Sequence, residues 1–176
     1  MCINRWPVIY DFDDLLKEIE KLKKDEIEFY QSKEKELAYL CQGDIFELAN
    51  SFPYIDEDGD ISLEETKTWV LIGNTCDMQR NVSDLKYTQI APLYELTDEE
   101  IAPVLNDLKA YQSFKKFYFK KFENKHYILD FTRICTIDKS FLKINAKKIK
   151  ELSMPGWVLF HCCIVRYLAR DDGRND

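Results

Sequence analysis

A dense polar cluster follows a short apolar run near the middle of the chain. Residues 69–72 are all apolar, which is typical of a strand buried on both faces, and the run ends at Gly73. Binding and catalytic groups often lie where a rigid strand passes into a loop. We therefore expect the loop 74–80 to bind a ligand, through the side chains of Asn74, Thr75, Cys76, Asp77 and Arg80.

Two arrangements of this loop are compatible with its residues. In the first, Cys76 is a nucleophile, because a neighbouring arginine lowers a thiol pKa, and His126 or His161 is its base. In the second, Asp77 and Arg80 form an ion pair that holds the loop, and Cys76 packs as a small apolar residue. The carboxylate of Asp77 raises the thiol pKa, so the second arrangement and a binding role are favoured. Arg80 then offers a planar cation to phosphate or carboxylate, and Asp77 orients it.

Aromatic rings alternate with lysines in the segment 114–122. Grooves that bind single-stranded nucleic acid combine rings that stack on bases with ammonium groups that follow phosphates. In a strand, the same pattern is typical of a sheet edge protected by lysine. If the segment binds single-stranded RNA, we expect the contacts to come from Lys115, Lys116, Phe117, Phe119, Lys120 and Lys121.

The acidic stretch 54–65 matches most of an EF-hand calcium loop. Asp56, Asp58 and Glu65 stand at ligand positions of that pattern, but Tyr54 stands where the first aspartate should be. We therefore predict a hydrated acidic turn between two strands. The six cysteines and two histidines show no paired spacing, so we expect neither a metal nor a cofactor.

The elements that must position these residues follow from periodicity and caps. Strands are predicted at 43–48, 69–72, 87–96, 114–122, 127–137 and 141–144, with a turn at 138–140. A helix is predicted from Thr97, which forms a capping box with Glu100, towards Tyr111. Nearer the N-terminus we predict an extended stretch at 1–10, an amphipathic helix from Asp11, and further helix at 27–40.

The last apolar stretch begins after Pro155 and is apolar on nearly every side, so we predict a buried helix. Packing in the core of its own domain is the simpler interpretation, and a homodimer seam is the alternative. Residues 171–176 are predicted to be frayed. The chain is thus divided into a helical N-terminal extension, 1–42, and a single globular domain, 43–176.

Composition limits the class of protein. With 176 residues, 45% hydrophobic and 14% aromatic, the chain can bury a core and is not disordered. Its net charge of −7 hides an asymmetry, since residues 1–66 are strongly acidic and residues 109–150 strongly basic. The acidic helix can lie against the basic segment or face solvent, or the basic side can face an anionic partner. No apolar run reaches the roughly 18 residues that cross a bilayer and the N-terminus has no signal-peptide pattern, so we expect a cytoplasmic protein without membrane contact.

The order of motifs in 43–96 resembles the opening half of PemK-like toxin barrels. Those begin with Gly-Asp-Ile, present here as Gly43-Asp44-Ile45, continue through an apolar strand, and end that half with an apolar strand that contains a proline, here Pro92. The chain also looks like a set of bacterial proteins, some from phage-defence neighbourhoods, in which the second strand leads into a Cys-Asp pair. The resemblance implies a small, mostly antiparallel SH3-like barrel. With the acidic N-terminal helix and the buried C-terminal helix predicted above, we expect an α+β protein.

The chain departs from the PemK pattern where catalysis would be placed. In PemK toxins an Arg-Pro pair precedes the apolar strand and a Ser or Thr follows it. Here Lys67-Thr68 stands in place of Arg-Pro, and Gly73 stands in place of the serine. We therefore expect a binding or accessory module of a bacterial toxin–antitoxin or phage-defence system, with a protein partner in that system. The alternative is a degenerate, metal-independent endoribonuclease. In that case Arg80 would stabilise the phosphorane charge, and Asp77 or His126 would be the general base.

Overall fold

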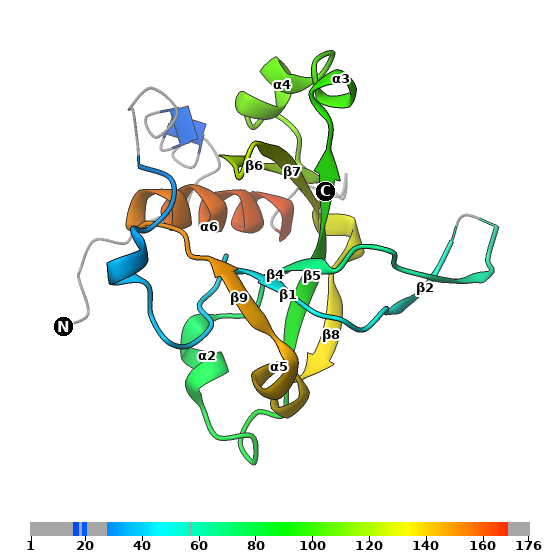
Figure 1. Cartoon of the computed structure of the whole chain (residues 1–176), viewed down its shortest axis with the longest axis vertical. Coiled ribbons are helices and arrows are strands. Elements are labelled where there is room, and N and C mark those ends of the chain that lie inside the picture. The colour runs from blue at the N-terminus through cyan, green and yellow to red at the C-terminus, as the bar shows by residue number, and fades with distance from the viewer. Residues whose placement is uncertain (1–15, 18, 21–27, 57, 169–176) are drawn as a thin grey trace, which may run out of the picture.

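The fold is an α+β arrangement of helices around a curled antiparallel sheet (Figure 1). It is seen in a computed structural model that describes residues 16, 17, 19, 20, 28–56 and 58–168. The strand order in the sheet is β6-β7-β5-β4-β1-β9, and β8 pairs with β5 beside this path. The predicted α+β class and mostly antiparallel sheet are therefore confirmed.

The strands of the main sheet are β1 (Ile45–Glu47), β4 (Thr68–Leu71), β5 (Tyr87–Leu96), β6 (Lys116–Phe122), β7 (Lys125–Asp130), β8 (Cys135–Asp138) and β9 (Lys147–Lys150). The long strand β5 organises them. It pairs with β4 near its middle, with β8 through Tyr87 to Ile90, and with β7 through Leu93 to Leu96. The strands predicted at 43–48, 69–72, 87–96 and 114–122 are all present, and the prediction at 127–137 is divided between β7 and β8 by the short turn η2 (Phe131–Arg133).

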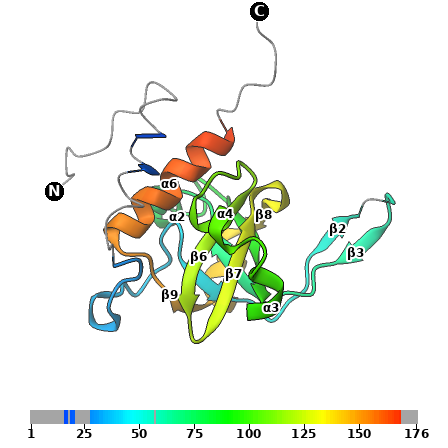
Figure 2. The same ribbon diagram turned by 90° about the horizontal axis from the view of Figure 1, so that it is seen from above.

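A separate hairpin of β2 (Pro53–Ile55) and β3 (Ile61–Leu63) projects from the body of the molecule (Figure 2). It contains the acidic stretch that resembled a calcium loop. Strands flank the acidic turn, whereas an EF-hand needs a helix on each side. The prediction of an acidic turn between two strands is confirmed.

The helix predicted from Thr97 is present but divided into α3 (Asp98–Ile101) and α4 (Leu105–Lys109). Its capping box is formed, with Thr97 Oγ1 accepting from the Glu100 backbone N–H and the Glu100 carboxylate accepting from the Thr97 N–H. Pro103 explains the division, because proline lacks the backbone donor that a continuous helix needs.

The turn predicted at 138–140 and the strand predicted at 141–144 are wrong. Asp138 caps a helix instead, accepting from the backbone N–H groups of Ser140 and Phe141. The helix is α5 (Lys139–Asn145), and it buries Leu142. The strand follows the helix as β9, which pairs with β1.

The helix predicted at 27–40 is wrong for the described part, residues 28–40. Only the short turn η1 (Lys33–Lys35) is helical there, and the rest is held by long-range contacts. Tyr30 forms an isolated bridge with Leu152, and the Gln31 N–H donates to the Glu151 carbonyl at 2.9 Å. Residues 16, 17, 19 and 20 are helical, in line with the amphipathic helix expected in that region. The extended stretch 1–10, the helix start at Asp11 and the frayed end 171–176 lie outside the described residues.

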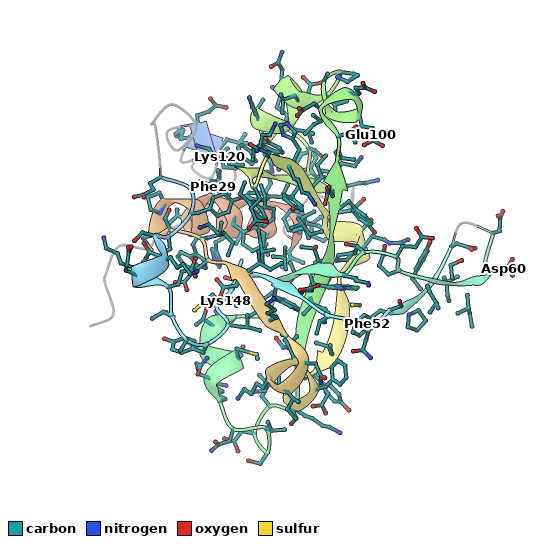
Figure 3. The ribbon with its side chains drawn as sticks, viewed as in Figure 1. Phe29, Phe52, Asp60, Glu100, Lys120 and Lys148 are labelled. Atoms are coloured by element: carbon teal, nitrogen blue, oxygen red, sulfur yellow. The ribbon has the colours of Figure 1, made fainter. Side chains whose placement is uncertain are left out.

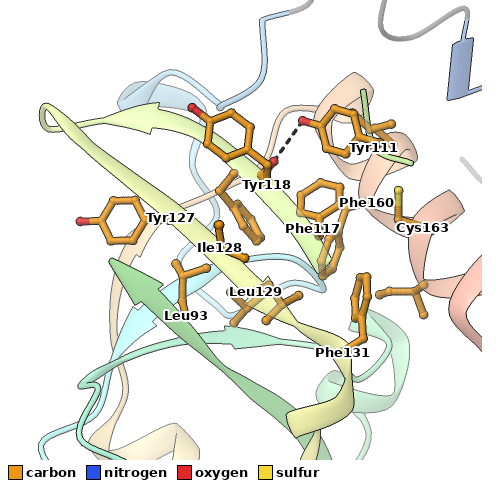
Figure 4. Packing of buried hydrophobic residues seen from close by; sticks show 14 of the residues in the cluster. Leu93, Tyr111, Phe117, Tyr118, Tyr127, Ile128, Leu129, Phe131, Phe160 and Cys163 are labelled. Carbon is orange, nitrogen blue, oxygen red and sulfur yellow. Dashed lines mark hydrogen bonds between the residues drawn. The ribbon is translucent and has the colours of Figure 1, made fainter. Parts of the chain in front are cut away.

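The core has one part on each face of the sheet. The larger part lies between the sheet and α6 (Met154–Leu168), where Phe117, Phe119 and Phe131 pack against Phe160 (Figure 4). The smaller part lies on the opposite face and contains Leu40, Phe46, Leu48, Trp69, Leu71, Met78, Ile90, Ile137 and Leu142. Strand β4 contributes to both parts, as predicted for a strand buried on two faces. The buried C-terminal helix is confirmed as well.

Candidate functional site

The segment predicted as a binding loop is mostly helical. Asn74 caps the five-residue helix α2 (Thr75–Gln79), and its side chain accepts from the Cys76 N–H at 2.8 Å. Met78 is the buried residue of this helix and packs into the smaller core. Asparagine is one of the best N-caps because its side-chain oxygen satisfies an unpaired N–H of the first turn. Residues 74–80 are therefore a short rigid element, and the prediction of a loop is wrong.

A fully buried lysine fixes the position of α2. Lys139 is the first residue of α5 and has no solvent exposure. Its ammonium donates to the carbonyl of Asp77 at 2.8 Å and to that of Arg80 at 3.0 Å. These carbonyls lie at the end of α2, where a cation complements the helix dipole. Burying an ammonium is costly unless its donors are satisfied, so these bonds strongly restrict where α2 can lie.

The start of α2 is fixed by Gln42. Its backbone N–H donates to Thr75 Oγ1 at 2.9 Å, and its side-chain nitrogen donates to the Ile72 carbonyl at 2.8 Å. The side-chain oxygen of Gln42, Oε1, also accepts from Trp157 Nε1 and lies 3.2 Å from His161 Nδ1, both on α6. Burial lowers the pKa of His161, so the neutral imidazole is favoured.

The outer side of α2 carries the exposed groups. Asp77 and Arg80 form the predicted ion pair at 3.5 Å, with side chains 42% and 63% exposed. An exposed pair of this kind contributes little stability and leaves the guanidinium available to a ligand. Cys76 is exposed, so the expectation that it packs as a small apolar residue is wrong.

His126 lies at the opposite end of β5. It pairs with Leu96, whereas the residue that leads into α2, Gly73, donates its N–H to the Gln89 carbonyl. At 3.3 Å per residue, Gln89 and Leu96 are roughly 20 Å apart along the strand. The structure therefore does not bring His126 together with Asp77 and Arg80, which were expected to act together in catalysis.

Structural contacts occupy both ring nitrogens of His126. Nδ1 lies 2.9 Å from the Tyr118 hydroxyl, and Nε2 lies 2.8 Å from Asp98 Oδ1. Asp98 also accepts from Lys121 at 2.9 Å, and the pKa of Asp98 is lowered by Lys121 first and by His126 second. This network ties the start of α3 to the β6–β7 hairpin.

The lysine-aromatic segment forms β6, but its rings are not available to bases. Phe117 and Phe119 are fully buried and face α6, with their ring centroids 5.1 and 5.7 Å from that of Phe160. The stacking role predicted for these two rings is therefore wrong. Of the four lysines predicted to contact RNA, Lys115, Lys116 and Lys121 are exposed and Lys120 is half-buried. Strand β6 lies at the edge of the sheet, so its lysines fit the alternative interpretation of the pattern, the protection of a sheet edge.

A groove opens between α2 and α5. Its volume is about 280 Å³, and it is lined by Ala38, Tyr39, Leu40, Met78, Gln79, Leu142, Lys143, Ala146 and Lys148. Met78 and Gln79 come from α2, so the anchoring by Lys139 also sets the shape of this wall. Arg80 follows Gln79 directly. The sequence does not predict this groove, because the groove depends on α5, where the sequence pattern predicts a strand.

A charged cluster that was also not predicted lies at the base of the β2–β3 hairpin. Buried Glu64 accepts from the Tyr94 hydroxyl at 3.0 Å and from Arg133 at 3.2 Å. The Arg133 guanidinium stacks on Tyr54, 3.6 Å from the ring centre. Cavities of about 470 and 760 Å³ border the cluster, and Tyr54 and Glu64 line both. These charges are already paired with one another.

Asp44, the carboxylate of the Gly-Asp-Ile motif, is fully buried and pairs with Lys148 at 2.7 Å. Lys148, labelled in Figure 3, also donates to Glu151 and to the carbonyls of Leu37 and Tyr39. Burial raises the pKa of Asp44 to about 7, although the bond from Lys148 acts in the opposite direction. The motif residue therefore fastens the segment before β1 to β9.

No family model matches the chain, and no curated protein matches it. In the described part of the chain, no three His, Cys, Asp or Glu side chains lie together as metal ligands would. No helix within 28–56 or 58–168, or among the four described residues before them, is long and apolar enough to span a bilayer.

Proposed function

We propose that the protein is a binding module that recognises an anionic ligand on the surface formed by α2 and α5. The observation that carries this proposal is the groove of about 280 Å³ whose α2 wall is fixed by the buried ammonium of Lys139. A site that holds its shape before the ligand arrives loses less entropy on binding. A buried charge, which is unfavourable in itself, thus stabilises the position of a surface helix of only five residues.

The groups around the groove favour a ligand that joins a small apolar part to a phosphate or carboxylate. Met78, Leu142 and Ala146 give an apolar lining. Arg80, next to this wall, is exposed and only weakly engaged by Asp77. By contrast, Glu64 and Arg133, which line the larger cavities under the hairpin, are already paired with one another.

We further propose that this module is an SH3-like barrel of the PemK type that serves a bacterial toxin or phage-defence system in the cytoplasm. The curled antiparallel sheet supports this assignment, because the three strands that carry the motifs of 43–96, namely β1, β4 and β5, are neighbours in it. The proposal concerns the fold and does not extend to the catalytic activity of PemK toxins, because proteins with the same barrel fold can have unrelated functions.

Nuclear magnetic resonance titration tests the binding site. Inorganic phosphate, acetate and a short single-stranded RNA are added separately to ¹⁵N-labelled protein. We expect at least one of them to shift amide signals of α2 and α5, and we expect Arg80→Gln to weaken that response about tenfold, as for the loss of one charge-assisted contact. Lys109→Gln on α4 is the matched control, since Lys109 is exposed on a different element.

Three results would contradict the proposal. Amide-signal shifts confined to β6 and β7, or no shifts with any of the three probes, would contradict the ligand site on α2. Cleavage of the RNA that is lost in Arg80→Gln would favour the endoribonuclease, and would require Arg80 to act without His126.

A further inference from the structure

The β2–β3 hairpin, residues 53–63, presents an apolar face to solvent; we call it the arm. Its register pairs Pro53 with Leu63 and Ile55 with Ile61, which places all four side chains on the same face. Ile55, Ile61 and Leu63 are 72%, 80% and 61% exposed. An isolated two-stranded hairpin is only marginally stable in water, and a grouped apolar surface usually marks a contact.

The other face of the arm is held firmly by the body of the protein. Tyr54 lies under the Arg133 guanidinium, which is paired with Glu64. The Glu64 N–H also donates to the Phe52 carbonyl at 2.8 Å, which closes the base of the arm. The arm is therefore fastened to the body at Tyr54 and at its base, while its apolar face is left outward.

The tip of the arm is a tight acidic turn. The Asp56 carboxylate accepts from the N–H groups of Asp58 and Asp60 and from the Ser62 hydroxyl. Gly59 supplies the left-handed residue, with φ of +87°. The side chains of Asp58 and Asp60 are exposed beyond this turn, and Asp60 is labelled at the tip in Figure 3. Because the stretch 51–65 contains acidic residues but no lysine or arginine, the arm repels phosphate and attracts cations.

A surface of the opposite charge and similar apolar character lies on α5 and β9 of the same chain; we call it the patch. Ile144 is 81% exposed, and Lys143 and Lys147 on either side of it are exposed too. The stretch 139–150 contains no acidic residue. Lys139 is buried, and Lys148 and Lys150 are paired with acidic side chains of other segments, so Lys143 and Lys147 carry the exposed positive charge. The patch therefore matches the arm both in charge and in its exposed aliphatic side chain.

We propose that the arm of one molecule docks on the patch of a second copy of this chain. Ile55, Ile61 and Leu63 pack around Ile144, and the acidic tip approaches Lys143 and Lys147. The exchange is reciprocal, so that the same contact forms twice about a two-fold axis and closes a dimer. Because the acidic arm and the basic patch belong to the same sequence, a second copy of this chain is the partner that fits the arm.

Sedimentation velocity across low-micromolar to near-millimolar concentrations measures the association. We expect a monomer–dimer equilibrium that weakens as salt rises, because the charges lie near the surface. Ile61→Ser should weaken the dimer by at least about tenfold, since it removes a buried contact from both copies of the interface. Val104→Ser, an exposed apolar position outside the arm and the patch, is the matched control.

Charge exchange provides the decisive test. Asp58→Lys with Asp60→Lys gives a variant whose arm repels the patch, and Lys143→Glu with Lys147→Glu gives one whose patch repels the arm. Each variant alone should be monomeric. Mixed in equal amounts, they should form a heterodimer, because each arm then meets a patch of opposite charge.

A wild-type protein that stays monomeric at all these concentrations would overturn the proposal. A dimer that survives both charge-reversed pairs, or no heterodimer on mixing, would do the same. Lys143 borders both the patch and the ligand groove, so the two proposals are separated by variants elsewhere. Arg80→Gln should leave the dimer unchanged, and Asp58→Lys with Asp60→Lys should leave ligand binding unchanged, which distinguishes failure of the dimer from failure of the ligand site. Circular dichroism of every variant confirms that the exposed substitutions preserve the fold.

Discussion

Gly73 connects the buried strand β4 to the helix α2, and the structure predicts that it tolerates no side chain. A Cβ at this position would lie 2.1 Å from Thr88 Oγ1 and 3.3 Å from the Gln89 backbone nitrogen. Thr88 is buried and its χ1 is stiff, as in other β-branched residues, so the hydroxyl has little room to move. Gly73→Ala should therefore push α2 away from β5.

The expected size follows from that clash. Overpacking of one methyl group costs about 1–3 kcal/mol, and the N–H of residue 73 must keep its 3.0 Å bond to the Gln89 carbonyl while the chain shifts. Thr88→Ala should remove most of this cost. It deletes the clashing hydroxyl, which has no hydrogen-bond partner, and leaves the two β-carbons about 3.4 Å apart.

Urea unfolding followed by tryptophan fluorescence gives the free energies for a double-mutant cycle. We expect Gly73→Ala and Thr88→Ala to be coupled by about 1–3 kcal/mol, with the double variant more stable than the sum of the single changes implies. Gly59→Ala serves as the control, because its cost comes from a positive φ with open space around it and should add to that of Thr88→Ala. Additive costs for Gly73→Ala and Thr88→Ala, or a harmless Gly73→Ala, would refute the steric argument.

Three further predictions concern the core, the buried carboxylate and the arm. Burial raises the pKa of Asp44 to about 7, so the contribution of this carboxyl to the free energy of unfolding should fall as the pH rises from about 4 to about 7. In a plot of urea midpoint against pH, Asp44→Asn should reduce the slope between these two pH values. Phe119→Ala should lower the free energy of unfolding by about 3–5 kcal/mol in the same assay, because it removes a fully buried ring. Phe114→Ala, at an exposed position, should lower it by much less. Micromolar calcium should leave tryptophan fluorescence unchanged, since Asp56 is engaged within its own turn.

The strands around the site could be predicted because their signals are local and long. The apolar run at 69–72 and the alternation in 87–96 bury side chains whichever partners they meet, so β4 and β5 were correctly placed. The capping box at Thr97 is equally local, since both of its bonds lie within one turn.

The short helices could not be predicted with the same success. Helices as short as α2 and α5 are unstable alone and depend on tertiary contacts. Asn74 and Asp138 are both good N-caps, which was the available signal, but the same residues are also common in loops and turns. In each case tertiary packing decided, through Met78 for α2 and Leu142 for α5.

By itself, the sequence determined the fold class, the strands that carry the site, and the polar identity of residues 74–80. The tertiary structure alone decided which of those groups can act together. It placed His126 at the far end of β5 from Arg80, turned Phe117 and Phe119 into the core, and brought the Lys139 ammonium beneath α2. The physical reason is that sequence periodicity shows which face of a helix or strand is buried. Which distant side chains come together depends instead on the strand order and on the end of a strand at which each neighbouring element pairs.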